Sequence, residues 1–213
     1  MTFLHVFDMD GTLIRGTSAS VQVARTCETE AELADLERAF SAGEIDTKAF
    51  AAALHAMWSD VTEEHVDRAF ADTPFLDGIA DVCADIRERG ERSIVVTMSP
   101  DFFARRLLGF GFDDVAASRF PALPFARPLD PDAILVPQDK VRIVEESRQA
   151  AEIPVERCVA YGDSMSDAPL FGHLAHSVAV NADHHLAGIA GAEYRGTSLL
   201  EAYARGRELV AAA

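Results

Sequence analysis

The stretch FDMDGTL, residues 7–13, comes at the end of the chain's first apolar run. That run, residues 2–7, predicts a short buried strand. Two carboxylates, Asp8 and Asp10, then follow two residues apart in a tight loop that contains Gly11. One carboxylate in such a loop is suited to attack phosphorus, and the other to protonate the leaving oxygen. Gly11 lets backbone N–H groups come close to phosphate oxygens.

The composition limits the classes of protein to which the chain can belong. Its 213 residues are 49 % hydrophobic, which is enough for one sizeable domain or a domain with a smaller insert. The 35 acidic and 19 basic residues give a formal net charge of −16. Because a surface of this charge repels nucleic acid and anionic membranes, we expect neither as a partner. Any phosphate site must therefore carry its own local positive charge.

Three scattered cysteines, Cys27, Cys83 and Cys158, lie mostly in apolar runs. Their odd number and irregular spacing predict reduced core residues rather than a disulfide framework or a metal cluster. The charges of Asp8 and Asp10 interrupt the first apolar run, and no later run is long enough to span a membrane. We therefore expect a soluble cytoplasmic protein, either a monomer or a homodimer.

The periodicity changes once along the chain. From residue 15 to about residue 72 it is helical, and it predicts the helices 18–27, 30–42, 46–57 and 62–72. Strands and helices then alternate; the predicted strands are 93–97, 115–120, 157–161 and 177–181. Alternation of this kind predicts an α/β fold with a Rossmann-like parallel sheet covered on both faces. We expect a core domain of residues 1–14 and 75–213, with a helical cap, residues 15–74, inserted after the first strand.

Polar side chains follow the later strands as they follow the first. Thr97 ends one strand, Lys140 begins a helix, and Asp163 and Asp167 follow another strand. Each one alone has a simpler explanation, such as a turn, a helix cap or a surface lysine. In this order, at the edge of the sheet where ligands bind, they predict a site for Mg²⁺ and phosphate. Either Thr97 or Ser99 could supply the phosphate-binding hydroxyl, and Thr97 is preferred because it directly ends its strand.

These motifs resemble those of the haloacid dehalogenase superfamily of phosphohydrolases. The resemblance is closest to the subfamily with a small helical cap, which contains phosphoserine phosphatase. Asp8-Met9-Asp10-Gly11-Thr12 is similar to the first motif, Thr97 to the second, Lys140 to the third, and Gly162-Asp163-Ser164-x-x-Asp167 to the fourth. The resemblance covers essentially the whole chain, and it implies an enzyme, a phosphoric monoester hydrolase with Mg²⁺ as cofactor.

The resemblance also implies a role for each residue. Asp8 is expected to be the nucleophile and a metal ligand, and Asp10 the general acid/base and a ligand through its carbonyl. Asp163 completes the protein's metal ligands, and Asp167 supports the metal through its water shell. The residues expected to hold the phosphoryl group are Met9, Gly11, Thr97, Met98 and Lys140.

The expected substrate is a small phosphate ester other than phosphoserine. By an ungapped comparison, Thr17 stands where phosphoserine phosphatases have a glutamate that grips the substrate amino group, and Met57 where they have an arginine for its carboxylate. Candidates for reading the substrate are thus Arg15, Thr17, Met57 and Trp58. The alternatives are phosphoserine phosphatase itself, a phosphotransferase of the same fold and, least favoured, a non-catalytic phospholigand-binding protein.

Overall fold

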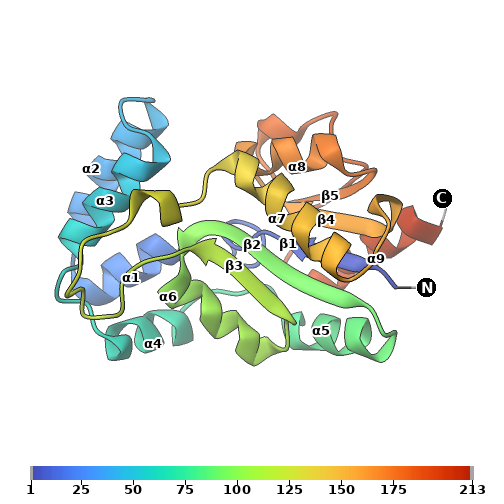
Figure 1. Cartoon of the computed structure of the whole chain (residues 1–213), viewed down its shortest axis with the longest axis horizontal. Coiled ribbons are helices and arrows are strands. Elements are labelled where there is room, and N and C mark those ends of the chain that lie inside the picture. Colours follow the sequence, from blue (N-terminus) through green and yellow to red (C-terminus); the bar gives the residue numbers. More distant parts are fainter. Residues whose placement is uncertain (1, 212–213) are drawn as a thin grey trace.

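The computed structural model describes residues 2–211 and contains one parallel sheet of six strands (Figure 1). The order across the sheet is β3-β2-β1-β4-β5-β6. The strands are β1 (Leu4–Phe7), β2 (Arg92–Pro100), β3 (Asp114–Ser118), β4 (Cys158–Gly162), β5 (His176–Val180) and β6 (Ala192–Tyr194). The central strand is β1, which pairs with β2 on one side and β4 on the other. The end of β1 therefore lies in the middle of the sheet's carboxyl edge.

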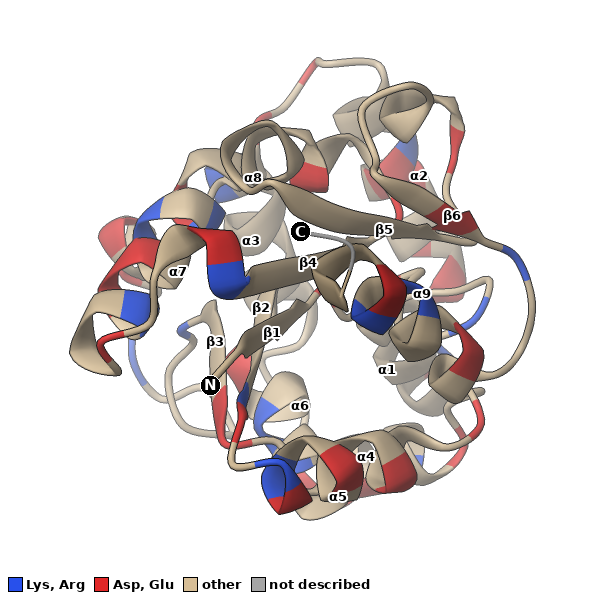
Figure 2. Cartoon of the chain, turned by 90° about the vertical axis from the view of Figure 1, so that its right-hand side faces the viewer, with Lys and Arg blue, Asp and Glu red and all other residues tan. Residues whose placement is uncertain are grey.

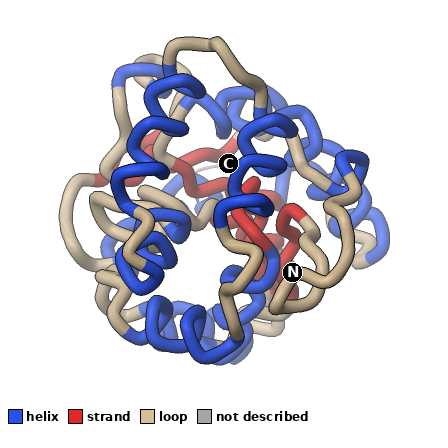
Figure 3. Tube along the Cα trace, turned by 90° about the vertical axis from the view of Figure 1, so that its left-hand side faces the viewer, coloured by secondary structure: helices blue, strands red, loops and turns tan. Residues whose placement is uncertain are grey.

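Both faces of the sheet are buried, because successive side chains of each strand point to opposite sides. Phe7 and Tyr161 pack with α5 (Ile79–Glu88) and α9 (Leu199–Ala211). Val6 and Ala160 pack on the other face with α7 (Pro137–Ala150) and α8 (Ala168–His173). Figure 3 shows the strands in the interior with helices around them, and Figure 2 shows β1, β4 and β5 without charged residues. The predicted fold class is confirmed.

The helices α1 (Ala19–Cys27), α2 (Glu30–Ser41), α3 (Thr47–Met57) and α4 (Glu63–Ala71) lie together beyond the carboxyl edge of the sheet (Figure 1). Three of them begin at side-chain caps: Ser18 accepts from the N–H of Val21, Asp46 from that of Ala49, and Thr62 from that of His65. The described part of residues 15–74 contains no strand longer than an isolated bridge. Our division into core and cap remains a prediction.

A proline-rich segment, residues 119–136, joins β3 to α7 and is called the strap below. It has little regular structure, with only a short 3-10 turn at Pro131–Ala133. It passes along the cap on its way (Figure 1). The ring of His55 on α3 stacks on Phe125 with centroids 4.7 Å apart, and its Nε2 lies 2.9 Å from the carbonyl oxygen of Arg127. Lys48 pairs with Asp132 at 3.1 Å. The strap thus links the cap to the core.

Several elements differ from the sequence-based expectations. The strand predicted to end at Thr97 continues to Pro100, so Thr97 does not end β2. The pattern predicts a helix from residue 140, but α7 begins at Pro137, since proline is favoured in a first helical turn. The predicted strand 115–120 ends at Ser118, because the N–H of Phe120 turns to the carboxylate of Asp101 instead of the sheet. The edge strand β6 was not predicted, because three residues that include Glu193 carry no strand pattern.

Across residues 2–211, no helix combines the length and the apolar character needed to cross a bilayer.

Candidate active site

The ammonium group of Lys140 lies between two carboxylates. Its Nζ is 2.6 Å from Asp8 Oδ1 and 2.6 Å from Asp167 Oδ1, and all three side chains are buried. Because α7 begins at Pro137, Lys140 falls at the end of the first helical turn, facing the end of β1. Burial disfavours the charged form of Lys140, but the two carboxylates outweigh it and raise its pKa above the ordinary value. Lys140 is therefore a fixed positive charge beside Asp8.

Asp10 is held by groups from the cap and from β2. Its Oδ1 accepts a hydrogen bond of 2.6 Å from the N–H of Ala19, at the start of α1. Its Oδ2 accepts from Ser99 Oγ at 2.5 Å and lies 3.5 Å from Thr97 Oγ1. Burial raises the pKa of Asp10, although these hydrogen bonds oppose the rise. A carboxyl group with a raised pKa is suited to donate a proton and later to accept one.

Asp163 carries the clearest sign of a missing ligand. Its Oδ1 is buried and has no hydrogen-bond partner among the described residues, and a buried polar atom is costly to leave unpaired. Carboxylate oxygens of Asp8, Asp163 and Asp167 lie within 4.8 Å of one another. Burial, followed by the charge of Asp167, raises the pKa of Asp163 to about 7. Hard oxygen donors of this kind fit Mg²⁺.

Asp167 supports the loop as well as the lysine. Its Oδ2 accepts from the backbone N–H groups of Asp163, at 3.0 Å, and Ser164, at 3.3 Å. The other oxygen pairs with Lys140, so both oxygens of Asp167 already have protein partners. This arrangement agrees with a supporting role for Asp167 and leaves the unpaired oxygen on Asp163.

Two glycines make the close packing of this site possible. Gly11 has a φ of +77°, in the left-handed region that favours glycine, and a Cβ there would lie 2.0 Å from Asp163 Oδ2. A Cβ on Gly162 would lie 2.3 Å from the Asp167 carboxyl carbon. Glycine at position 11 therefore lets the loop after β1 approach Asp163, and glycine at position 162 lets Asp167 fold back onto the end of β4.

The candidate substrate-reading residues do not share one environment. Trp58 is only 1 % exposed; its indole N–H donates to Thr29 Oγ1 at 3.1 Å, and its ring meets the edge of Phe102. It therefore packs between the cap helices and Phe102 rather than facing a ligand. Thr17 is partly buried and accepts from Gln22 Nε2 at 3.0 Å, Met57 is partly buried against the core, and Arg15 is exposed.

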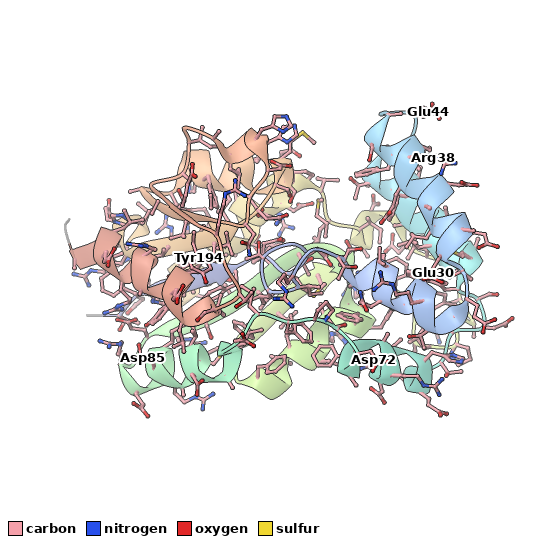
Figure 4. All side chains as sticks on the ribbon, turned by 180° about the vertical axis from the view of Figure 1, so that it is seen from behind. Glu30, Arg38, Glu44, Asp72, Asp85 and Tyr194 are labelled. Atoms are coloured by element: carbon pink, nitrogen blue, oxygen red, sulfur yellow. The ribbon has the colours of Figure 1, made fainter. Side chains whose placement is uncertain are left out.

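Glu37 of α2 is an acidic residue that the sequence does not single out. Glu37 is half-buried, and burial, followed by the negative charge of Asp10, raises the pKa of its carboxyl group. Figure 4 labels Arg38 on α2 and Glu44 in the loop that follows it, and both lie away from the sheet. No pattern in the sequence distinguishes Glu37 from the other acidic residues of α2. Its partial burial depends on how α2 packs in the folded chain.

The sequence of the chain is similar to those of a known protein family. Residues 5–172 match the haloacid dehalogenase-like hydrolases. The chain belongs to this family. The predicted resemblance is therefore confirmed, and the chain is a hydrolase of this class. A phosphoserine phosphatase from Idiomarina loihiensis is 26 % identical over 208 residues, which is 93 % of this chain and 90 % of that protein.

Solved structures agree on the fold. A HAD family hydrolase from Salmonella enterica serovar Typhi superposes with a TM-score of 0.82 at 18 % identity, covering 93 % of this chain and 69 % of that one. A phosphoserine phosphatase with an analogue of its phospho-aspartyl intermediate superposes with a TM-score of 0.79 at 22 % identity, covering 95 % and 98 %. The fold of the chain therefore has counterparts among solved structures of hydrolases.

Proposed function

We propose that this hydrolase is a Mg²⁺-dependent phosphatase that cleaves a small-metabolite phosphomonoester through an aspartyl-phosphate on Asp8. The observation that carries this proposal is the unpaired, buried oxygen of Asp163 beside Asp8, while Lys140 holds the other side of Asp8 at 2.6 Å. A carboxylate set built in this way has a place for a cation and an oriented nucleophile. The residues that would hold Mg²⁺ are Asp8, Asp163 and the carbonyl of Asp10, with Asp167 acting through its water shell.

In the first step, a carboxylate oxygen of Asp8 attacks phosphorus and the bond from phosphorus to the ester oxygen breaks. Asp10 donates a proton to that oxygen, so the product leaves as an alcohol. In the second step Asp10 takes a proton from water, the water oxygen attacks phosphorus, and the bond to Asp8 breaks to release phosphate. Lys140 stays charged throughout and offsets the crowded carboxylates. Mg²⁺, when bound, supplies the further positive charge that brings the carboxylate and the phosphate together.

Asp10 favours ester hydrolysis over the cleavage of a carbon–halogen bond. A departing alkoxide needs a proton, whereas a departing halide does not. The hydrogen bonds from Ser99 and from the backbone N–H of Ala19 fix the position of the Asp10 carboxyl group in the loop after β1. Transfer of the phosphoryl group to an acceptor other than water uses the same residues and differs in how well the cap excludes water.

We further propose that the substrate is not phosphoserine, although the relative named above is a phosphoserine phosphatase. Thr17 and Met57 carry no charge with which to pair a zwitterion. An ammonium or carboxylate buried without a partner costs about 1–3 kcal/mol or more. Phosphoserine should accordingly be a poorer substrate than an ester without these charges.

The test is phosphate release from a panel of sugar, polyol, amino-acid, nucleotide and choline phosphates, with Mg²⁺ or with EDTA. Mg²⁺-dependent release that is lost in Asp8→Asn and kept in the matched surface variant Asp60→Asn is the expected result. Release that survives in Asp8→Asn would refute the aspartyl-phosphate. An efficiency on phosphoserine that equals the best of the panel would refute the substrate proposal alone.

A further inference from the structure

A second group of side chains with the chemistry to hold a metal ion follows β5, outside the catalytic set. Asp183, His184 and His185 are consecutive and exposed, and each offers one ligand atom within 4.8 Å of the others. Asp183 Oδ1 accepts from the backbone N–H of His185 at 2.8 Å, and the two imidazole rings lie side by side with centroids 4.0 Å apart. The turn thus brings one carboxylate and two imidazoles to one point on the surface.

The separation of the donor atoms suits a single ion. His185 Nδ1 lies 3.0 Å from Asp183 Oδ2. Two ligands bound tetrahedrally at about 2.0 Å from one ion lie about 3.3 Å apart. An ion could therefore replace the proton that these two atoms share, with only a small adjustment. Among the described residues, no hydrogen bond occupies the ring of His184, so that imidazole is available as the next ligand.

We propose that Asp183, His184 and His185 bind a divalent cation of the zinc class, such as Zn²⁺, Ni²⁺ or Co²⁺. Imidazole nitrogen favours these ions, whereas Mg²⁺ prefers oxygen alone. The chemistry of this set therefore differs from the all-carboxylate set around Asp8, and the two sites select different ions.

The surroundings leave room for the remaining coordination positions and anchor the turn. A cavity of about 410 Å³ is lined by Asp183 and His184 together with Tyr194, which Figure 4 labels at the end of β6. Water can fill positions that the protein leaves open there. The backbone N–H of Asp183 donates to the carbonyl oxygen of Asp163 at 2.9 Å. The proposed site is therefore tied to the loop that carries a catalytic carboxylate.

The test uses the full chain without a histidine tag, in saturating Mg²⁺, titrated with Zn²⁺ against a chromophoric chelator. We expect one Zn²⁺ equivalent whose affinity falls at least about tenfold in His184→Ala/His185→Ala. The affinity should be unchanged in His173→Ala, another partly exposed histidine, and in Asp163→Asn. Paramagnetic Ni²⁺ should broaden the ring protons of His184 and His185 before those of other histidines.

Zn²⁺ binding that is equal in the wild type and in the double histidine variant would overturn the proposal, since the catalytic carboxylates would then hold the ion. The absence of Zn²⁺ binding from the wild type would overturn it as well. Neither result bears on the phosphatase reaction, because the histidine variant keeps Asp8, Asp10 and Lys140. Phosphate release by that variant, measured alongside, separates the two proposals.

Discussion

The replacement Lys140→Met tests how the site is held together. It keeps the length of the side chain and removes the only ammonium between Asp8 and Asp167. Lys140 and Asp167 are each 1 % exposed and Asp8 is 6 % exposed, so water cannot take the place of the lost charge. The variant must therefore either protonate or leave unpaired at least one carboxylate that the wild type keeps paired with Lys140.

Removing one partner of a buried ion pair costs about 3–5 kcal/mol, because the other partner is left buried and uncompensated. For a chain of this size each kcal/mol lowers the melting temperature by about 2–4 °C, so Lys140→Met should melt about 6–20 °C below the wild type. The measurement is thermal unfolding in EDTA, so that no cation replaces the lysine. Adding Asp167→Asn removes one excess carboxylate and should restore part of the loss.

The matched control is Lys48→Met. Lys48 and Lys140 are the only lysines of the chain, and Lys48 makes an exposed pair with Asp132. Exposed pairs contribute about 0–1 kcal/mol, so this variant should melt within a few degrees of the wild type. A Lys140→Met protein as stable as Lys48→Met, with no gain from Asp167→Asn, would refute the reasoning.

Three further predictions concern packing, metal and pH. Gly11→Ala should fold but lose at least about a hundredfold in phosphate release, because its Cβ would lie 2.0 Å from Asp163 Oδ2 and displace a catalytic loop. Mg²⁺ at a hundred times its Kd should stabilise the wild type by about 2.7 kcal/mol in thermal unfolding, and Asp163→Asn should lose most of that gain. Burial lowers the pKa of His5, so below about pH 6.5 the unfolded chain takes up a proton that the folded chain does not. Stability should then fall from pH 7 to pH 5 in urea unfolding, and less steeply in His5→Gln.

Each of the three has its own contrary result. Full activity in Gly11→Ala would mean that the two loops can separate without harm. Equal Mg²⁺ stabilisation in Asp163→Asn would place the ion elsewhere. If the free energy of unfolding changes with pH equally in His5→Gln and in the wild type, the titrating group is not His5. Another group, such as Glu91, which lies 3.0 Å from His5, would then be responsible.

The core of the fold could be predicted because its signals are local. Apolar runs bounded by Gly and Asp mark β1 and β4, and the helix caps Ser18, Asp46 and Thr62 stand in the sequence. Parallel strands bring their carboxyl ends to one edge, so the meeting of Asp8, Lys140 and Asp167 could be predicted from their order alone.

What could not be predicted depends on contacts between distant segments. The strand β6 exists because β5 offers an edge to pair with, not because of its own three residues. Ser99 makes the 2.5 Å contact with Asp10, and Thr97 lies 3.5 Å away, a difference that depends on the irregular backbone at the end of β2. The burial of Trp58 depends on how α3 packs, which an ungapped comparison of sequences does not reveal.

The strap has a consequence for the rate at which the enzyme turns over. If the cap were joined to the core only near residues 14 and 75, it could rotate as a rigid body about that connection. Here α3 also contacts the strap through His55 and Lys48. Opening that side means unstacking His55 from Phe125 and breaking two polar contacts, each worth about 0.5–1.5 kcal/mol at most. The contacts of the strap therefore oppose opening of the cap on that side. Entry of the substrate or release of the product, rather than bond breaking, would then be the slow step of the cycle.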